Sequence, residues 1–88
     1  MSYIYRIYTE KTEALPAQIE AVSKEFESFT LIESQGYWKG EPEASVIFEI
    51  ICPEAEGLDI LTLAQEIKRL GGQEAVLCTE QTLDSVLV

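Results

Sequence analysis

The chain has 88 residues, 47% hydrophobic and 25% charged, with a formal net charge of −10. A length this short allows one hydrophobic core, which predicts a single domain over residues 1–88, and the hydrophobic content argues against a disordered chain. The excess of acidic residues repels phosphate backbones, which argues against direct nucleic-acid binding.

Residues 3–9 predict the first strand of a sheet, because their aromatic and β-branched side chains favour a pleated backbone. Successive side chains of a strand point to opposite faces, and one of these faces carries the charged Arg6. We expect the uncharged face to meet the helices; its residues are Tyr3, Tyr5 and Ile7.

Residues 15–28 predict a helix, since apolar side chains recur there at intervals of three and four. Pro16 suits the first turn of this helix, where its missing N–H costs nothing. The predicted apolar stripe consists of Leu15, Ile19, Val22, Phe26 and Phe29.

Residues 30–39 and 44–52 predict the second and third strands. Residues 40–43 contain glycine and proline, which favour a short hairpin connection between the two strands. The third strand is expected to direct its even-numbered residues toward the helices, namely Val46, Phe48, Ile50 and Cys52.

A second helix is predicted to start at Asp59, which suits the N-cap position, and to stop at Gly71-Gly72. Its predicted apolar stripe is Ile60, Leu63, Ala64, Ile67 and Leu70. Residues 74–80 fit a short fourth strand. For residues 81–88 two alternatives stay open, a short extra strand or a packed tail.

This order of elements predicts an α+β, ferredoxin-like βαββαβ fold. Right-handed crossovers place the first and third strands in the middle of a four-stranded antiparallel sheet of order 4-1-3-2, with both helices on one face. The third and fourth strands then lie about 9.6 Å apart, beyond the reach of a disulfide. Cys52 and Cys78 are therefore expected to stay unlinked, and we expect them to point to opposite faces of the sheet.

Compartment and chemistry follow from what the sequence lacks. No apolar run approaches the roughly 18 residues of a membrane span, and the first residues do not resemble a signal peptide, so a cytoplasmic protein is expected.

The chain has no histidine, the commonest general base and metal ligand, and no glycine-rich nucleotide motif. Acid pairs such as Glu41 with Glu43 are interpreted as solvated loop residues. We therefore expect no catalytic residue, cofactor or metal site.

The side of the sheet away from the helices is predicted to mix apolar anchors with a few charges. Such a patch on a small protein usually marks an interface. The residues expected there are Ile4, Arg6, Tyr8, Glu33, Gln35, Tyr37, Ile47, Glu49 and Ile51, with Val76 as a further candidate. Arg6 and Glu49 are expected to form a cross-strand ion pair or to align a ligand carboxylate. Tyr37 and Trp38, beside the hairpin, form a second candidate contact.

Two segments of the chain stand out, the run Phe-Thr-Leu-Ile-Glu-Ser-Gln-Gly-Tyr-Trp-Lys-Gly from Phe29 and the run from Val46 to Glu54. They resemble the core of the nitrogen-regulatory PII family, in which a strand with a glycine-aromatic step precedes an effector loop. The resemblance implies a trimeric, ferredoxin-like sensor that regulates a partner protein. Here the effector loop is cut to residues 40–44, and the family's phosphate-binding basic residues have no counterpart beyond Lys39. ATP binding is therefore not carried over.

Three functional hypotheses follow. The first is a non-enzymatic regulatory or protein-binding module that self-associates, as a dimer or trimer, through the uncovered sheet face and presents the hairpin to another protein. The second is an acidic inhibitor, of a kind that phages encode, that mimics a nucleic acid. The third is a small α/β-barrel-type enzyme with Tyr8 as acid, Arg6 as electrostatic clamp and Glu49 as base.

Overall fold

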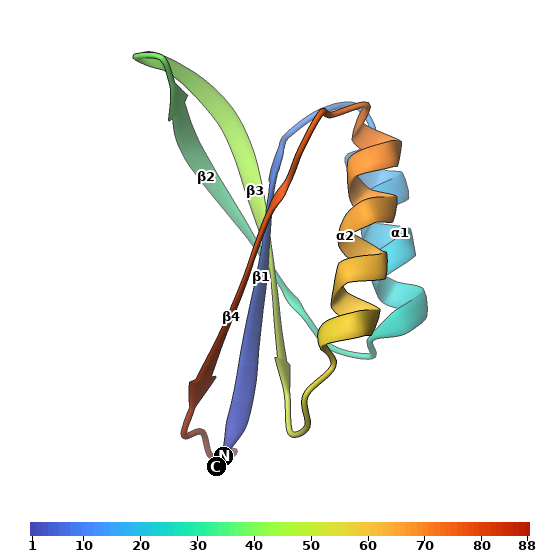
Figure 1. Ribbon diagram of the computed structural model, residues 1–88, viewed down its shortest axis with the longest axis vertical. Helices are drawn as coiled ribbons and strands as arrows, with labels where there is room; N and C mark the ends of the chain where they lie inside the picture. The colour runs from blue at the N-terminus through green and yellow to red at the C-terminus, as the bar shows by residue number, and fades with distance from the viewer.

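The computed structural model describes all 88 residues and contains one four-stranded antiparallel sheet with two helices on one side (Figure 1). The elements in chain order are β1 (Ser2–Glu10), α1 (Leu15–Glu25), β2 (Thr30–Trp38), β3 (Glu41–Cys52), α2 (Gly57–Gly71) and β4 (Leu77–Leu83). The strands lie in the order β2-β3-β1-β4, which is 4-1-3-2 when it is counted from the β4 edge. The predicted ferredoxin-like fold class is confirmed.

The hydrophobic core lies between the sheet and the two helices. β1 contributes Tyr5 and Ile7, and β3 contributes its even-numbered residues from Val46 to Cys52, as strand parity predicts. The helices supply the other half of the core, with Val22 from α1 and a stripe from α2. The buried α2 residues are Ile60, Leu63, Ala64 and Ile67. Removal of this apolar surface from water is the main term that stabilises the fold.

α1 is shorter than predicted. It ends at Glu25, and Phe26 adopts an extended backbone as the C-cap residue. The predicted stripe still reaches the core from the loop, because Phe29 packs against Phe48 with ring centroids 6.0 Å apart. Apolar spacing alone could not distinguish a last helical turn from an extended segment that buries the same side chains.

α2 begins before the predicted N-cap. Glu56 occupies that position, and Asp59 lies in the first turn, where its charge still suits the positive end of the helix. The N–H of Glu56 donates to the Tyr5 hydroxyl at 2.8 Å, so β1 holds the start of α2. Gly72 ends the helix in a left-handed conformation with φ of 62°, as the predicted glycine stop requires. Neither helix has the length and apolar character needed to span a lipid bilayer.

The β2–β3 hairpin is longer than predicted, because its turn consists of only Lys39 and Gly40. Their φ values of 51° and 80° suit a two-residue hairpin turn. Trp38 pairs directly with Glu41, so the predicted connection over residues 40–43 is wrong. Pro42 lies inside β3, at a point where β3 has a neighbouring strand on one side only, and proline is tolerated at such an edge.

β4 begins three residues later than predicted and continues to Leu83, so Val76 precedes the strand. The register places Cys78 opposite Ile7, on the side that faces the helices. Cys52 faces the same side, so the expectation that the two thiols point to opposite faces is wrong. Both cysteines are free, as predicted. Residues 84–88 form neither a strand nor a helix.

Candidate functional site: the open face of the sheet

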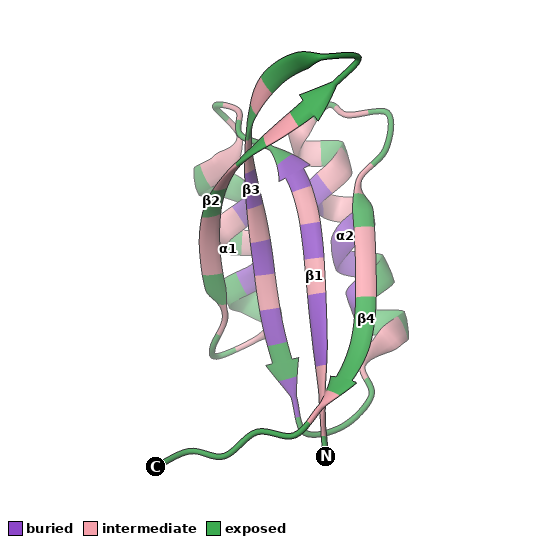
Figure 2. Cartoon of the chain, turned by 90° about the vertical axis from the view of Figure 1, so that its left-hand side faces the viewer, coloured by how far each residue is buried: buried purple, intermediate pink, exposed green.

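The face of the sheet turned away from the helices carries no covering layer (Figure 2). We call it the open face and define it by ten residues that the strand register places there: Ile4, Arg6, Tyr8, Ile32, Ile47, Glu49, Ile51, Leu77, Thr79 and Gln81. Six of the ten are apolar or aromatic. Ile4 is only 5% exposed, whereas Ile51 and Leu77 are 48% and 60% exposed.

The two central strands bring six predicted interface residues together. Ile4 lies opposite Ile51, and Tyr8 lies opposite Ile47. Between these two apolar pairs the register places Arg6 opposite Glu49. The open face therefore has a charged centre flanked by apolar side chains on both sides.

The strand register shows that the β2 residues expected on this face lie on the other side of the sheet. Leu31 pairs with Phe48 and packs against the core, which sets the parity of the whole strand. Ile32 therefore takes the place opposite Ile47. The side chains that lie on the helix side instead of the open face are Glu33, Gln35 and Tyr37. An alignment of Leu31 with the buried residues of β3 would have given the correct parity from the sequence.

β4 adds residues to the open face that were not predicted from the sequence. Leu77 lies opposite Tyr8, Thr79 opposite Arg6, and Gln81 opposite Ile4. The signal for them was weak, because the predicted strand ended at residue 80 and its apolar run centred on Val76. An edge strand pairs with one neighbour only, so its pattern is less constrained than that of a central strand.

Arg6 and Glu49 form the predicted ion pair at the centre of the open face. Arg6 Nε donates to Glu49 Oε2 at 2.9 Å, and Arg6 Nη1 donates to Gln81 Oε1 at 3.2 Å. Their side chains are 31% and 19% exposed. The hydrogen bond to Glu49 raises the pKa of the Arg6 guanidinium, so the charged form is favoured. The guanidinium still has unused N–H donors, and the carboxylate keeps acceptor capacity.

The outer end of the β2–β3 hairpin projects beyond the end of β1 (Figure 1), and we call residues 36–43 the arm. Tyr37 and Trp38 are 70% and 68% exposed and point to opposite faces of the arm. The Lys39 ammonium lies 5.7 Å from the centre of the Trp38 ring. Large aromatic side chains on a projecting ribbon are suited to contact with another molecule.

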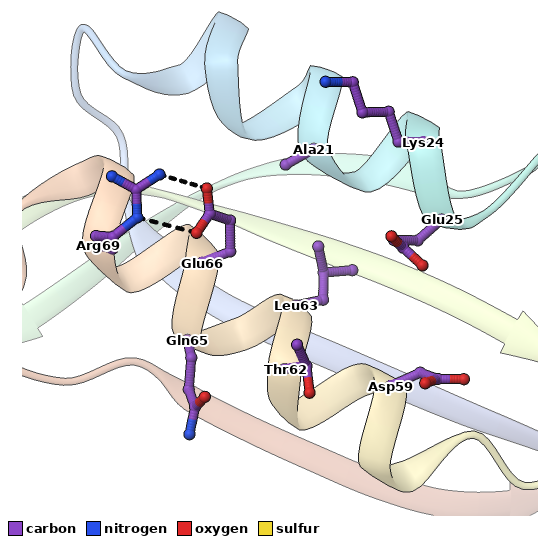
Figure 3. A pocket seen from close by; sticks show the side chains of 9 residues that line it. All are labelled: Ala21, Lys24, Glu25, Asp59, Thr62, Leu63, Gln65, Glu66 and Arg69. Carbon is purple, nitrogen blue, oxygen red and sulfur yellow. Dashed lines mark hydrogen bonds and ion pairs between the residues drawn. The ribbon is translucent and has the colours of Figure 1, made fainter.

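A hollow between α1 and α2 has a different character (Figure 3). Its lining is mostly polar, and Arg69 donates two hydrogen bonds to the carboxylate of Glu66, which lowers the pKa of Glu66. Lys24 lies 3.3 Å from Glu20 on the same helix. The basic groups are therefore paired within their own helices, which is typical of a solvated helix surface. No cluster of acidic or cysteine side chains is arranged to hold a metal ion.

Comparisons with known proteins give information on the fold. No family model matches the chain, and no curated protein matches its sequence. Among solved structures, a phage SAM lyase in complex with S-methyl-5'-thioadenosine matches with a TM-score of 0.66 and 18% identity, covering 91% of this chain and 80% of the lyase. A duf3240 family protein from Shewanella baltica has a TM-score of 0.72 and 14% identity, covering 98% and 97%. CutA1 from Oryza sativa has a TM-score of 0.66 and 15% identity, covering 98% and 83%.

The fold is ferredoxin-like. At these identities the likeness extends to the arrangement of the chain and does not extend to activity, ligands or assembly. The resemblance of two segments to the PII family stays a prediction, because no family model matches.

Proposed function

We propose that the protein is a non-enzymatic regulatory or binding module that self-associates through its open face. The observation that carries this proposal is the set of partly exposed apolar residues on one uncovered side of the sheet, with Ile32 opposite Ile47 on one side of the central ion pair and Ile51 on the other. Apolar area of this kind on a small domain is stabilised when another surface removes it from water. A standard interface covers about 800 Å² on each partner. Such an interface would cover about an eighth of the 6148 Å² that the whole chain exposes.

A second copy is the favoured partner because the centre of the open face is nearly neutral in a strongly acidic chain. Among its ten defining residues the charged ones are Arg6 and Glu49, and Glu10 follows on the same side of β1, whereas the chain as a whole has a net charge of −10. Two copies therefore repel each other least when they meet through this surface. The surface also offers both partners of an ion pair, so it is complementary to itself, as a symmetric interface requires.

Light scattering across a concentration series tests the proposal. The wild-type protein is expected to have the mass of a dimer or trimer of the 9.9 kDa chain. The double variant Ile47→Asp with Ile51→Asp is expected to stay monomeric, because its charges would be buried in the interface. Leu58→Asp is the matched control, since Leu58 is 83% exposed on α2, and it should associate like the wild type. A wild-type mass of 9.9 kDa at high concentration would contradict self-association.

The second proposal is that the same face serves an enzyme. It is supported by the adjacency of Tyr8, Arg6 and Glu49 and by the fold shared with a phage SAM lyase. Tyr8 would act as the acid and Arg6 as the clamp, but Glu49 is a weak candidate base because its carboxylate already accepts a bond from Arg6. The test is incubation with S-adenosylmethionine and a mass-spectrometric assay for S-methyl-5'-thioadenosine. Product above the buffer rate that disappears in Tyr8→Phe would support this proposal, and no product would remove cleavage of S-adenosylmethionine as the activity of this face.

The hypothesis of a nucleic-acid mimic has less support. A mimic requires acidic groups gathered on one solid face. The acidic residues here lie on both helices, on the arm and in the loop before α2, for example Glu25, Glu41 and Glu54. No specific observation favours this hypothesis over self-association.

A further inference from the structure

A groove opens where the sheet narrows from four strands to the two strands of the arm. It lies between the arm, the end of β1 and the connection from α2 to β4, and we call it the end groove. It is an open depression of about 780 Å³, a volume within the usual range for small-molecule sites. Three aromatic side chains contribute to its lining, namely Tyr8, Tyr37 and Trp38.

The end groove has an uncompensated negative charge. Three of its fourteen lining residues are glutamates, and none is a lysine or an arginine. The glutamates are Glu10, Glu43 and Glu74. None of them lies within 4.0 Å of a basic group, because the ion pairs of the chain involve other acids. Carboxylates along one groove that has no basic side chain in its lining make the local potential negative, which favours a cation there.

The aromatic lining indicates what kind of cation this is. The ring of Trp38 already attracts a positive group, since the ammonium of Lys39 lies 5.7 Å from its centre. Aromatic faces attract organic ammonium groups, whereas Mg²⁺ and Ca²⁺ require converging oxygen ligands. No group of three or more acidic side chains in the chain has the arrangement to hold a metal ion.

We propose that the end groove binds a small organic cation, with an ammonium group or a similar positive centre attached to an apolar or aromatic body. The carboxylates hold the charge, and the aromatic side chains on the open side of the sheet, Tyr8 and Trp38, contact the body. The proposal does not require self-association, because every residue it uses belongs to one copy, although Tyr8 also belongs to the open face.

Fluorescence gives a direct test, because Trp38 is the only tryptophan in the chain and lies in the groove. The probe is 2-phenylethylammonium, and its neutral counterpart 2-phenylethanol has the same aromatic body. At 0.15 M salt, which screens long-range attraction, the ammonium is expected to change the emission saturably and the alcohol is not. Glu43→Gln and Glu74→Gln should each weaken binding by about two- to fivefold, the range of a single exposed charge contact.

Two controls separate a site from general attraction. Glu25→Gln removes the same charge from α1, outside the groove, and should leave the affinity unchanged. Lys39→Met removes the ammonium already over the ring and should strengthen binding by about two- to fivefold. Equal responses to ammonium and alcohol, equal weakening by Glu25→Gln, or no response to the ammonium would each overturn the proposal. A response to Mg²⁺ alone that Glu43→Gln abolishes would also overturn it, in favour of a metal site.

Discussion

The two faces of the sheet are built from the same strands, but helices cover only one of them. On β3, Phe48 is fully buried beneath the helices, whereas its neighbour Ile47 points to the open face and stays partly exposed. Tyr5 and Arg6 on β1 differ in the same way, since one lies in the core and the other holds a solvent-accessible ion pair. Figure 2 shows this alternation along both central strands. One face therefore stabilises the monomer, and the other stays partly exposed to solvent, where we propose that it recognises a partner.

Substitutions at adjacent positions of β3 should separate the two roles most clearly. Phe48→Ala is expected to lower the free energy of unfolding by about 3–5 kcal/mol, because it leaves a cavity in the core. Ile47→Ala should cost less than about 1.5 kcal/mol in the monomer, because little buried area is lost. Urea denaturation at low protein concentration measures both. Equal losses at the two positions would contradict the assignment of one face to the core and the other to recognition.

Gly71 offers a sharper test of how tightly the covered side is packed. A Cβ at this position would lie 2.9 Å from the side-chain nitrogen of Gln18, which is fully buried and donates to the carbonyl oxygen of Ile67 at 2.9 Å. Gly71→Ala is therefore expected to cost about 1–3 kcal/mol, because the buried amide must shift. Gly57→Ala, at the start of the same helix and with no atom in the way, should be neutral or stabilising. The same urea series measures both, and a neutral Gly71→Ala would contradict close packing there.

The sequence predicted the central strands better than the edges. β1 and β3 have a neighbour on each side and a clear apolar alternation, so their faces were assigned correctly. β2 and β4 are edge strands with one neighbour each, and the parity of β2 and the bounds of β4 were wrong. A shift of one position in a strand exchanges its two faces, so small errors in register have large effects on a predicted surface.

The candidate site was predicted in part for the same reason. Arg6 and Glu49 could be paired because both lie on central strands at matching positions. The end groove could not be predicted, because it depends on where β1 ends relative to the arm and on the path of residues 72–77. Gln18 is a further example. Glutamine is a polar residue that is usually exposed, yet the position of Gln18 between the two helices buries it completely.

The pH dependence of stability should also differ between the faces. Burial raises the pKa of the Tyr5 phenol above its usual value of about 10. A raised folded-state pKa means that the stabilisation is complete below about pH 10 and is lost as the pH rises further. Tyr5→Phe should reduce this alkaline loss, but it should cost about 1 kcal/mol at pH 7 because the N–H of Glu56 loses its acceptor. Urea denaturation between pH 7 and 11 measures both effects.

The control for this prediction is an exposed tyrosine. Tyr37→Phe on the arm should leave the alkaline loss of stability unchanged. Burial also raises the pKa of the Cys52 thiol, so part of the loss should begin above about pH 8.5 and persist in Tyr5→Phe. An identical alkaline curve for the wild type and Tyr5→Phe would show that the buried phenol contributes nothing to it.

The ion pair between Arg6 and Glu49 gives the smallest effect in the monomer and the most specific test of the open face. Both side chains are partly exposed there, so water screens the pair, and a double-mutant cycle with Arg6→Met and Glu49→Gln should give a small coupling free energy at low protein concentration. Association would cover the pair and remove that screening, so the coupling should grow at high concentration. Urea denaturation of the four proteins at two concentrations measures this change. A coupling that is the same at both concentrations would mean that the pair stays in water, and the interface would then lie elsewhere on the molecule.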